Sequence, residues 1–282
     1  MSIRIVADST CDLSKDLIER YNISIIPLCI VMGDQSYYDG IETTPDEIYA
    51  WADANKTTPK TAAITMDKVE EILHPFMEAG DDIIFFGISG EMSTTCNVAR
   101  IVGEDKNYDK LFIIDSRNLS TGIGLQVIRA AELAEEGKTA EEIVVQINAA
   151  KDKVRASFVV DTLTYLARGG RCTAATALLA NTLKLHLEIV VKDGKMGVSK
   201  KYRGSVDSAL NKYVKDLQEE LLQADPARVF VTHSGCTQET IDKVYNFVKE
   251  LNYFDEIHIT RAGGVISSHC GPGTLGVLFY EK

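Results

Sequence analysis

The sequence predicts an α/β protein built from two domains, and three observations lead to this fold class. The 282 residues include 45% hydrophobic and 25% charged side chains, which suits a large core and most naturally two domains. In the first half, short apolar runs alternate with segments of helical periodicity, so a largely parallel sheet flanked by helices is expected. In the second half, Asp193-Gly194 separates two apolar runs and predicts a hairpin in a mixed sheet. We expect domains at residues 1–155 and 156–282.

The first half is expected to contain strands wherever a short apolar run is bounded by polar or turn residues. These runs are residues 3–7, 23–31, 83–88 and 111–114. The segments between and after them have helical spacing and predict helices at residues 13–21, 45–55, 66–79, 94–102, 122–136 and 139–153. Pro45 after Thr44 is typical of a first helical turn, and Gly137 is typical of a helix C-terminus.

The second half predicts further strands by the same criteria, at residues 157–160, 185–191, 196–200, 229–232, 256–260 and 275–280. Residues 161–171 read as a helix closed by the pair Gly169-Gly170. Residues 269–274 contain Gly271-Pro272-Gly273 and predict a tight loop that opens the last strand.

Charge and cysteine usage exclude several functional classes. A formal net charge of -11 and a pI near 5.0 argue against general affinity for nucleic acids or anionic membranes, because both surfaces would repel the chain. The six cysteines include no Cys-x-x-Cys pair, so we expect reduced thiols in a cytoplasmic protein rather than a zinc or redox motif. We expect no signal peptide and no membrane insertion, since no run approaches the roughly 20 apolar residues of a membrane span.

The segment from Ile83 to Thr95 carries the clearest signal for a binding site. An apolar run ends at the turn Ser89-Gly90-Glu91-Met92-Ser93, and helical spacing resumes after it. Such a turn is expected to direct serine hydroxyls and uncommitted backbone N–H groups to one point at the positive end of a helix, which suits an oxyanion. No Walker lysine and no Gly-x-Gly-x-x-Gly is present, so nucleoside phosphate binding is not indicated. Helix capping by Ser89 and Ser93 explains the segment equally well.

Asp8 and Asp12 follow the first strand and leave two enzyme interpretations open. Acidic side chains at a strand end could bind a metal, although capping of the next helix is the favoured interpretation. A metal-dependent phosphotransferase that uses Asp8 and Asp12 is therefore an alternative to simple binding. A serine hydrolase using Ser93, His269 and Asp8 ranks lower, because the sequence around Ser93 lacks the Gly-x-Ser-x-Gly elbow.

Three groups of motifs, taken in order, carry a family resemblance that extends nearly end to end. They are Asp8-Ser9-Thr10-Cys11-Asp12-Leu13, then Asp161-Thr162-Leu163 with Tyr165-Leu166 and Gly169-Gly170-Arg171, and finally Gly271-Pro272-Gly273 with Leu275-Gly276. In this order and spacing the chain resembles the DegV family of bacterial fatty-acid-binding proteins. The resemblance implies a two-domain α/β carrier, not an enzyme, that holds one long-chain fatty acid between its domains. In the characterised branch, such a carrier presents the carboxylate to a separate fatty acid kinase, which makes an acyl phosphate.

The resemblance also implies particular site residues and no cofactor or metal. The family's carboxylate-binding positions correspond to Thr61, Ser93 and His269, and Arg203 corresponds to a surface arginine implicated in kinase docking. Such a head site has two hydroxyls and an imidazole, with no arginine or lysine committed to it, which would keep the carboxylate reactive. Taken by itself, His269 would be interpreted as structural and Arg203 as a solvated charge.

This sequence departs from the family's serine-rich turn at two positions. The family usually has a second serine after the first and a glycine after the third, whereas this chain has Gly90 and Thr94. Ser93 itself is in place.

Overall fold

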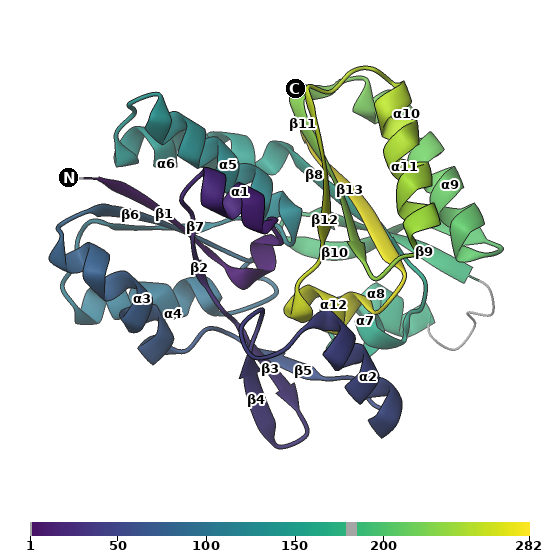
Figure 1. Ribbon diagram of the computed structural model, residues 1–282, viewed down its shortest axis with the longest axis horizontal. Coiled ribbons are helices and arrows are strands. Elements are labelled where there is room, and N and C mark those ends of the chain that lie inside the picture. The colour runs from purple at the N-terminus through teal and green to yellow at the C-terminus, as the bar shows by residue number, and fades with distance from the viewer. Residues whose placement is uncertain (1, 179–184) are drawn as a thin grey trace.

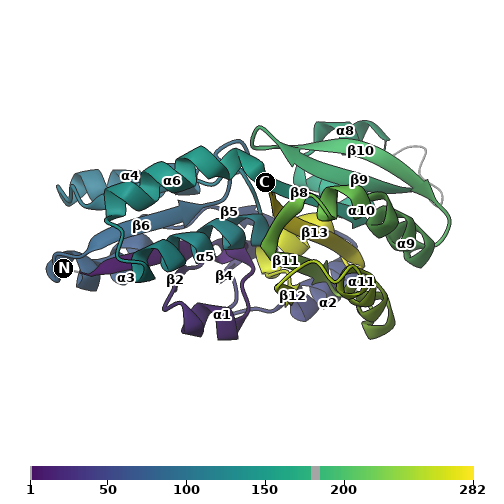
Figure 2. The ribbon, with the colours of Figure 1, turned by 90° about the horizontal axis from the view of Figure 1, so that it is seen from above.

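The computed structural model describes residues 2–178 and 185–282. Two large β-sheets lie side by side, one built from each half of the chain, and a small third sheet lies below their junction (Figure 1). Seen from above, the two halves form an elongated molecule (Figure 2). The predicted α/β class is confirmed.

The first large sheet is entirely parallel, with strand order β2-β1-β6-β7. Its strands are β1 (Ile3–Asp8), β2 (Ser24–Ile26), β6 (Asp82–Gly87) and β7 (Leu111–Asp115). Helices α3 (Met66–Glu78) and α4 (Thr95–Asp105) cover one face, and α1 (Lys15–Arg20), α5 (Thr121–Glu135) and α6 (Ala140–Ala150) cover the other (Figure 1). Because all carboxyl ends of parallel strands lie at one edge, the segments after β1 and β6 meet there.

The second large sheet is mixed, with strand order β10-β9-β8-β13-β11-β12. Its strands are β8 (Val154–Val160), β9 (Leu185–Lys192), β10 (Lys195–Arg203), β11 (Ala224–Ser234), β12 (Glu256–Arg261) and β13 (Thr274–Glu281). Helices α9 (Val206–Asp216), α10 (Gln218–Leu221) and α11 (Gln238–Glu250) lie on its outer side (Figure 1). The hairpin at Asp193-Gly194 is confirmed, and both residues have the positive φ that such tight turns require.

The predicted strand 23–31 is wrong as one element, because it divides into two strands of different sheets. Residues 24–26 form β2, and β3 (Cys29–Met32) joins the small antiparallel sheet β4-β3-β5. Pro27 lies between them and has no N–H to donate to a ladder, which separates the two strands. The partners of β3 are β4 (Gln35–Tyr38) and β5 (Lys60–Ala62), which sequence patterns did not predict.

Helix α2 (Pro45–Asn55) follows the small sheet and has the predicted start. Thr44 and Glu47 form a reciprocal capping box, and Pro45 occupies the first turn. Three predicted helices are shorter than expected: residues 13–21 give only α1, residues 139–153 give α6 followed by the short 3-10 helix η2 (Lys151–Lys153), and residues 161–171 give only α7 (Thr164–Gly169). Residues 9–11 form another 3-10 helix, η1 (Ser9–Cys11).

The junction between the halves is filled by side chains from both. One buried cluster joins Ile123 and Val127 of α5 to Phe158 of β8 and Leu278 of β13. Helices α7 (Thr164–Gly169), α8 (Thr173–Leu178) and α12 (Gly264–Cys270) also lie at this junction (Figure 1). Since a shared core spans residue 155, the division into domains 1–155 and 156–282 stays a prediction.

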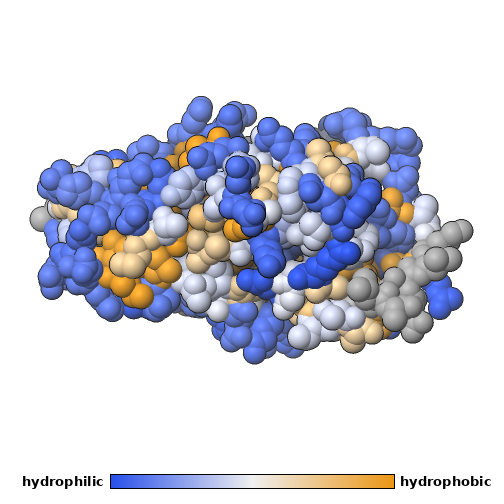
Figure 3. Space-filling model, turned by 90° about the horizontal axis from the view of Figure 1, so that it is seen from below, coloured by the Kyte–Doolittle hydropathy of each residue, from blue (hydrophilic) through white to orange (hydrophobic). Residues whose placement is uncertain are grey.

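Hydrophilic side chains cover much of one face of the molecule (Figure 3). On the face seen from below, hydrophilic side chains surround smaller hydrophobic areas (Figure 3). Within residues 2–178 and 185–282, no helix combines the length and apolar character that crossing a bilayer demands.

Candidate functional site

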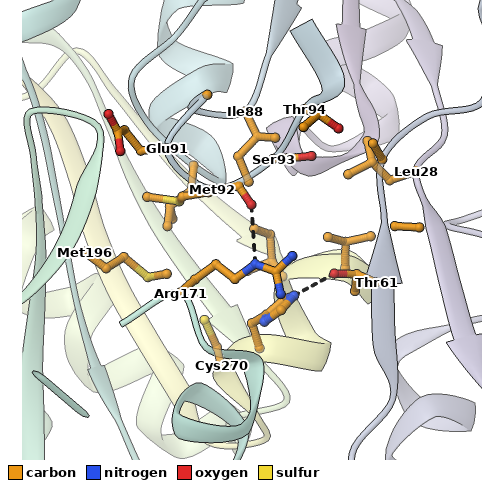
Figure 4. Close-up of a pocket in the computed structure, with 17 residues that line it drawn as sticks. Leu28, Thr61, Ile88, Glu91, Met92, Ser93, Thr94, Arg171, Met196 and Cys270 are labelled. Atoms are coloured by element: carbon orange, nitrogen blue, oxygen red, sulfur yellow. Dashed lines mark hydrogen bonds between the residues drawn. The ribbon is translucent and has the colours of Figure 1, made fainter. Parts of the chain in front are cut away.

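A cavity of about 340 Å³ lies where the two halves meet. Its apolar wall comes from both halves and includes Leu28, Ile88, Leu119, Met196 and Ile266. Thr61, Ser93, Arg171 and His269 supply polar groups (Figure 4). A volume of this size is within the range of about 300–1,000 Å³ typical of small-molecule sites. The arrangement therefore combines an apolar chamber with a small polar head.

Thr61 reaches the cavity from β5, an edge strand of the small sheet. Its Cα partner across the ladder is Ile30 of β3, so the register with β3 fixes its position along the strand. The Thr61 Oγ1 lies 2.7 Å from Nε2 of His269, which is 208 positions later in the chain. This hydrogen bond joins the small sheet to α12 at the head of the cavity.

Ser93 lies in the turn between β6 and α4, at the carboxyl end of the parallel sheet. Its Oγ is 2.9 Å from Oγ1 of Thr95. Capping by this serine is wrong, because Thr94 is the N-cap and makes no side-chain cap hydrogen bond. Capping by Ser89 is wrong as well, since its Oγ donates to the Gly194 carbonyl of the β9–β10 hairpin at 2.7 Å.

The expectation of uncommitted backbone N–H groups is wrong for residues 89 to 93 of this turn. Their N–H groups donate to the carbonyl of Asn118, the carboxylate of Asp115, and the hydroxyl and carbonyl of Ser89. These five donors are therefore not available to an anion, whereas the N–H groups of Thr94 and Thr95 at the start of α4 have no acceptor among the described residues. The turn thus places Ser93 beside the first N–H groups of α4.

His269 lies in the last turn of α12, not in the loop predicted for residues 269–274. The predicted loop that opens the last strand is confirmed at Gly271-Pro272-Gly273, between α12 and β13. It is wrong for His269 and Cys270, because α12 begins with Gly263-Gly264, which carries no helix-start signal of its own. Burial, and to a lesser extent the charge of Arg171, lowers the pKa of His269 to about 4. The imidazole is therefore neutral near pH 7.

The two ring nitrogens of His269 have different surroundings. Nε2 contacts Thr61, whereas buried Nδ1 has no hydrogen-bond partner among the described residues. Gly169 of α7 packs against Nδ1 so closely that a Cβ on this glycine would lie 2.2 Å from it. For buried Nδ1, being an acceptor without a partner costs less free energy than being an N–H donor without one. We therefore expect the ring proton on Nε2. His269 would then donate to Thr61 and leave the Thr61 hydroxyl proton directed at the cavity.

Arg171 is the site residue that sequence reasoning left out of the head. It follows the Gly169-Gly170 end of α7, donates from Nη1 to the Gly169 carbonyl at 2.8 Å, and donates from Nε to the Met92 carbonyl at 3.4 Å. Its side chain extends across the cavity toward Thr61 (Figure 4). The expectation of a head site without a cation is thus incomplete. The sequence feature that could have indicated Arg171 is the Gly169-Gly170-Arg171 motif. Gly170 adopts a left-handed conformation, which ends α7 and reverses the chain just before Arg171.

Asp8 and Asp12 both accept hydrogen bonds from the protein. Asp8 caps the 3-10 helix η1 by accepting from the Thr10 N–H, and it also accepts from the Ile88 N–H at 2.7 Å. The prediction that Asp8 or Asp12 caps the next predicted helix is wrong, because the N-cap of α1 is Ser14. Asp12 accepts from the Ser120 hydroxyl and the Gly263 N–H. Within the described ranges, no group of three or more His, Cys, Asp or Glu side chains is placed to hold a metal ion. Neither carboxylate thus offers the clustered geometry that the phosphotransferase alternative needs.

The serine hydrolase alternative is not supported by the contacts of its three residues. His269 is hydrogen-bonded to Thr61, Ser93 to Thr95, and Asp8 to backbone and side chain near η1 and β6. A catalytic triad would instead require a serine–histidine–carboxylate chain of hydrogen bonds.

Arg203, the residue predicted to contact a kinase, lies apart from the cavity and is exposed at the end of β10.

A second, very small cavity of about 20 Å³ adjoins the first. Leu119, Ile266 and Cys270 line both spaces, and Phe158 and Leu278 line the small one. The apolar chamber therefore points from the polar head toward the shared core between the sheets.

Comparisons with known proteins agree on one family. The sequence model of the DegV family, described as uncharacterised proteins, matches residues 2–282. A DegV domain-containing protein of Clostridium perfringens is 35% identical over 282 residues, with 99% of each chain covered. A DegV family protein of Thermus thermophilus, described as binding fatty acid, has 28% identity and a TM-score of 0.91, with 100% of each chain covered. A stearic-acid-binding protein of Eubacterium ventriosum has 28% identity and a TM-score of 0.87, covering 100% of this chain and 99% of its own.

Replacing His269 with Gln should change the acid dependence of stability. The pKa is about 4 in the folded protein and near 6.5 in the unfolded chain, so the unfolded state takes up the proton first as pH falls. His269 therefore lowers the free energy of unfolding as pH falls from 6.5 to 4, by up to about 1.4 kcal/mol per pH unit. Other buried groups, such as Asp8, titrate in both proteins, so the difference between the two urea-unfolding curves across this range should show that slope, with the wild type losing more stability than His269→Gln as pH falls.

His74→Gln is the matched control, because this histidine is exposed on α3. Its curve should follow that of the wild type. Identical slopes for wild type and His269→Gln would contradict a buried, neutral His269.

Proposed function

The chain belongs to the DegV family, and we propose that it binds one long-chain fatty acid in the cavity between its halves and presents the carboxylate to a separate kinase. The observation that carries the proposal is that Thr61, Ser93 and His269 line the same cavity as a set of apolar side chains. The neighbours from Thermus thermophilus and Eubacterium ventriosum, described as fatty acid binding and stearic acid binding, support the same ligand class.

The tail of the ligand would supply most of the affinity. Burying one methylene is worth roughly 0.8 kcal/mol, so about 15 methylenes would contribute on the order of 10 kcal/mol before ordering costs. We place the tail against Leu28, Met92 and Ile266, with its end directed toward the small cavity near Phe158. The six cysteines are all described and none forms a disulfide, which fits a reducing compartment, so we place the protein in the cytoplasm.

The head of the ligand would be held by hydroxyl donors near one cation. Thr61, oriented by His269, and Ser93 would each donate to a carboxylate oxygen. Arg171 would add positive charge, but two of its five N–H donors already serve backbone carbonyls. Because the carboxylate is not neutralised by a complete bidentate pair, it would keep its nucleophilic character.

The proposed kinase step is a phosphoryl transfer to this carboxylate. A carboxylate oxygen attacks the terminal phosphorus of a nucleoside triphosphate and forms a new O–P bond. The bond from that phosphorus to the bridging oxygen breaks, and the nucleoside diphosphate leaves with the electron pair. The nucleotide and its metal would belong to the partner, with Arg203 at the docking surface.

Mass spectrometry of lipid extracted from the purified protein tests the ligand class. We expect one fatty acid per chain, because the apolar chamber and polar head are sized and placed for a single amphipathic anion. Absence of lipid that persists after incubation with C14 to C18 fatty acids would overturn the proposal.

Removing either hydroxyl should weaken fatty acid binding. Ser93→Ala and Thr61→Ala each delete one hydrogen bond to a charged group, which costs about 1–3 kcal/mol, or roughly 5- to 150-fold in Kd. Isothermal titration with hexadecanoic acid measures the change, with exposed Ser199→Ala and Thr57→Ala as matched controls. Full affinity in both site variants would show that the head lies elsewhere.

Acyl phosphate should form only when a fatty acid kinase is added. Loaded protein is incubated with ATP and magnesium, with and without the kinase, and acyl phosphate is trapped with hydroxylamine. Arg203→Ala should slow the kinase-dependent reaction and leave fatty acid affinity unchanged, since Arg203 is exposed and outside the cavity. Exposed Arg100→Ala is the control. Product formed without the kinase would contradict the carrier role.

A further inference from the structure

Helix α12, which carries His269, is capped by carboxylates from the other half of the chain. Its N-cap residue, Gly263, has no side chain with which to cap the helix. Asp12 Oδ1 instead accepts from the Gly263 N–H at 2.8 Å, and Asp39 Oδ1 accepts from the Gly264 N–H at 2.7 Å. Asp39 Oδ2 also accepts from the Val265 N–H at 3.3 Å. Three successive N–H groups are thus held by residues more than 220 positions away.

Both carboxylates are themselves fixed in place. Asp12 is 5% exposed and accepts from the Ser120 hydroxyl at 2.5 Å, and Asp39 is 4% exposed and accepts from the Ser9 hydroxyl at 2.9 Å. The Ser9 oxygen also accepts from the backbone N–H of Leu28, which lines the cavity. Burial raises the pKa of both carboxyl groups, so these bonds offset the cost of burying them.

Helix α12 packs so closely against its cap that its backbone can shift very little. A Cβ at Gly264 would lie 2.5 Å from Cδ1 of Ile30 and 2.7 Å from Oδ1 of Asp39. The helix backbone therefore rests directly on β3 and on the Asp39 carboxylate. From Gly264 to His269 the helix rises only about 7 Å, so a shift at the cap would reach the imidazole almost undiminished.

We propose that Asp12 and Asp39 are positioning residues of the head site, which hold α12 so that His269 meets Thr61. Asp39 contributes more, because it accepts two N–H groups and contacts the helix through both oxygens. Neither carboxylate lines the cavity, so both act through His269 and not on the ligand. The effect on ligand affinity rests on the proposed function, whereas the effect on His269 does not.

A double-mutant cycle tests the proposal with hexadecanoic acid as the probe. Asp39→Asn keeps the side-chain shape but replaces one acceptor oxygen with an amide that faces an N–H donor. We expect it to weaken binding about 5- to 50-fold in the wild type and less than about 2-fold in His269→Ala, because its effect passes through the imidazole. Asp46→Asn is the control, since Asp46 is an exposed carboxylate that also links the two halves, through Arg261.

Equal losses in the two backgrounds, or no loss in either, would overturn the positioning role. If Asp39→Asn does not fold, Ser9→Ala repeats the cycle, because it removes a hydrogen bond to the carboxylate and leaves the carboxylate in place. NMR titration of the His269 ring is the second readout. Because burial is the main cause of its low pKa, a shift of α12 that exposes the ring in Asp39→Asn should raise the pKa above about 4, and an unchanged titration would overturn the proposal even if the wild type bound no fatty acid.

Discussion

The polar end of the cavity depends on one hydrogen bond between segments that are far apart in sequence, from Thr61 of β5 to His269 of α12. Each partner needs a different part of the fold. Thr61 is placed by its register with β3, and His269 by a helix docked on that same strand. The bond therefore exists only when the small sheet, α12 and the segments that hold them have all assembled.

Polar groups in the junction are matched to protein partners almost everywhere except at the cavity. Asp8, Asp12 and Asp39 each receive two or more donors, and the N–H groups of residues 89 to 93 all have acceptors. Such pairing is what buried charge requires. Buried atoms without a hydrogen-bond partner among the described residues are few, and they include His269 Nδ1 at the cavity as well as Gln126 Oε1 and His233 Nδ1 elsewhere.

Sequence patterns predicted the elements that rest on local signals. Strands β1, β6 and β7 of the parallel sheet, the capping box of α2 and the Asp193-Gly194 hairpin each have their cause within a few residues. The family resemblance named Thr61, Ser93 and His269, and all three line one cavity. Their roles toward a ligand remain predictions.

The features that the sequence did not predict depend on contacts between residues far apart in the chain. Helix α12 starts at two glycines and is capped by Asp12 and Asp39, so no local signal marks it. The serine turn was expected to offer free N–H groups, but Asp115 at the end of β7 and Asn118 just after that strand accept two of them. Arg171 reaches the head because α7 ends against His269, a contact between residues about 100 positions apart.

The remote capping of α12 has a consequence for synthesis of the chain. Segments near residues 12, 39 and 61 leave the ribosome early, but the helix that they receive spans residues 264–270. Contacts of such sequence separation form late, because the intervening chain must be ordered first. A nascent chain accordingly has no closed cavity until α12 has been synthesised, and an intermediate that lacks this helix cannot sequester a ligand there.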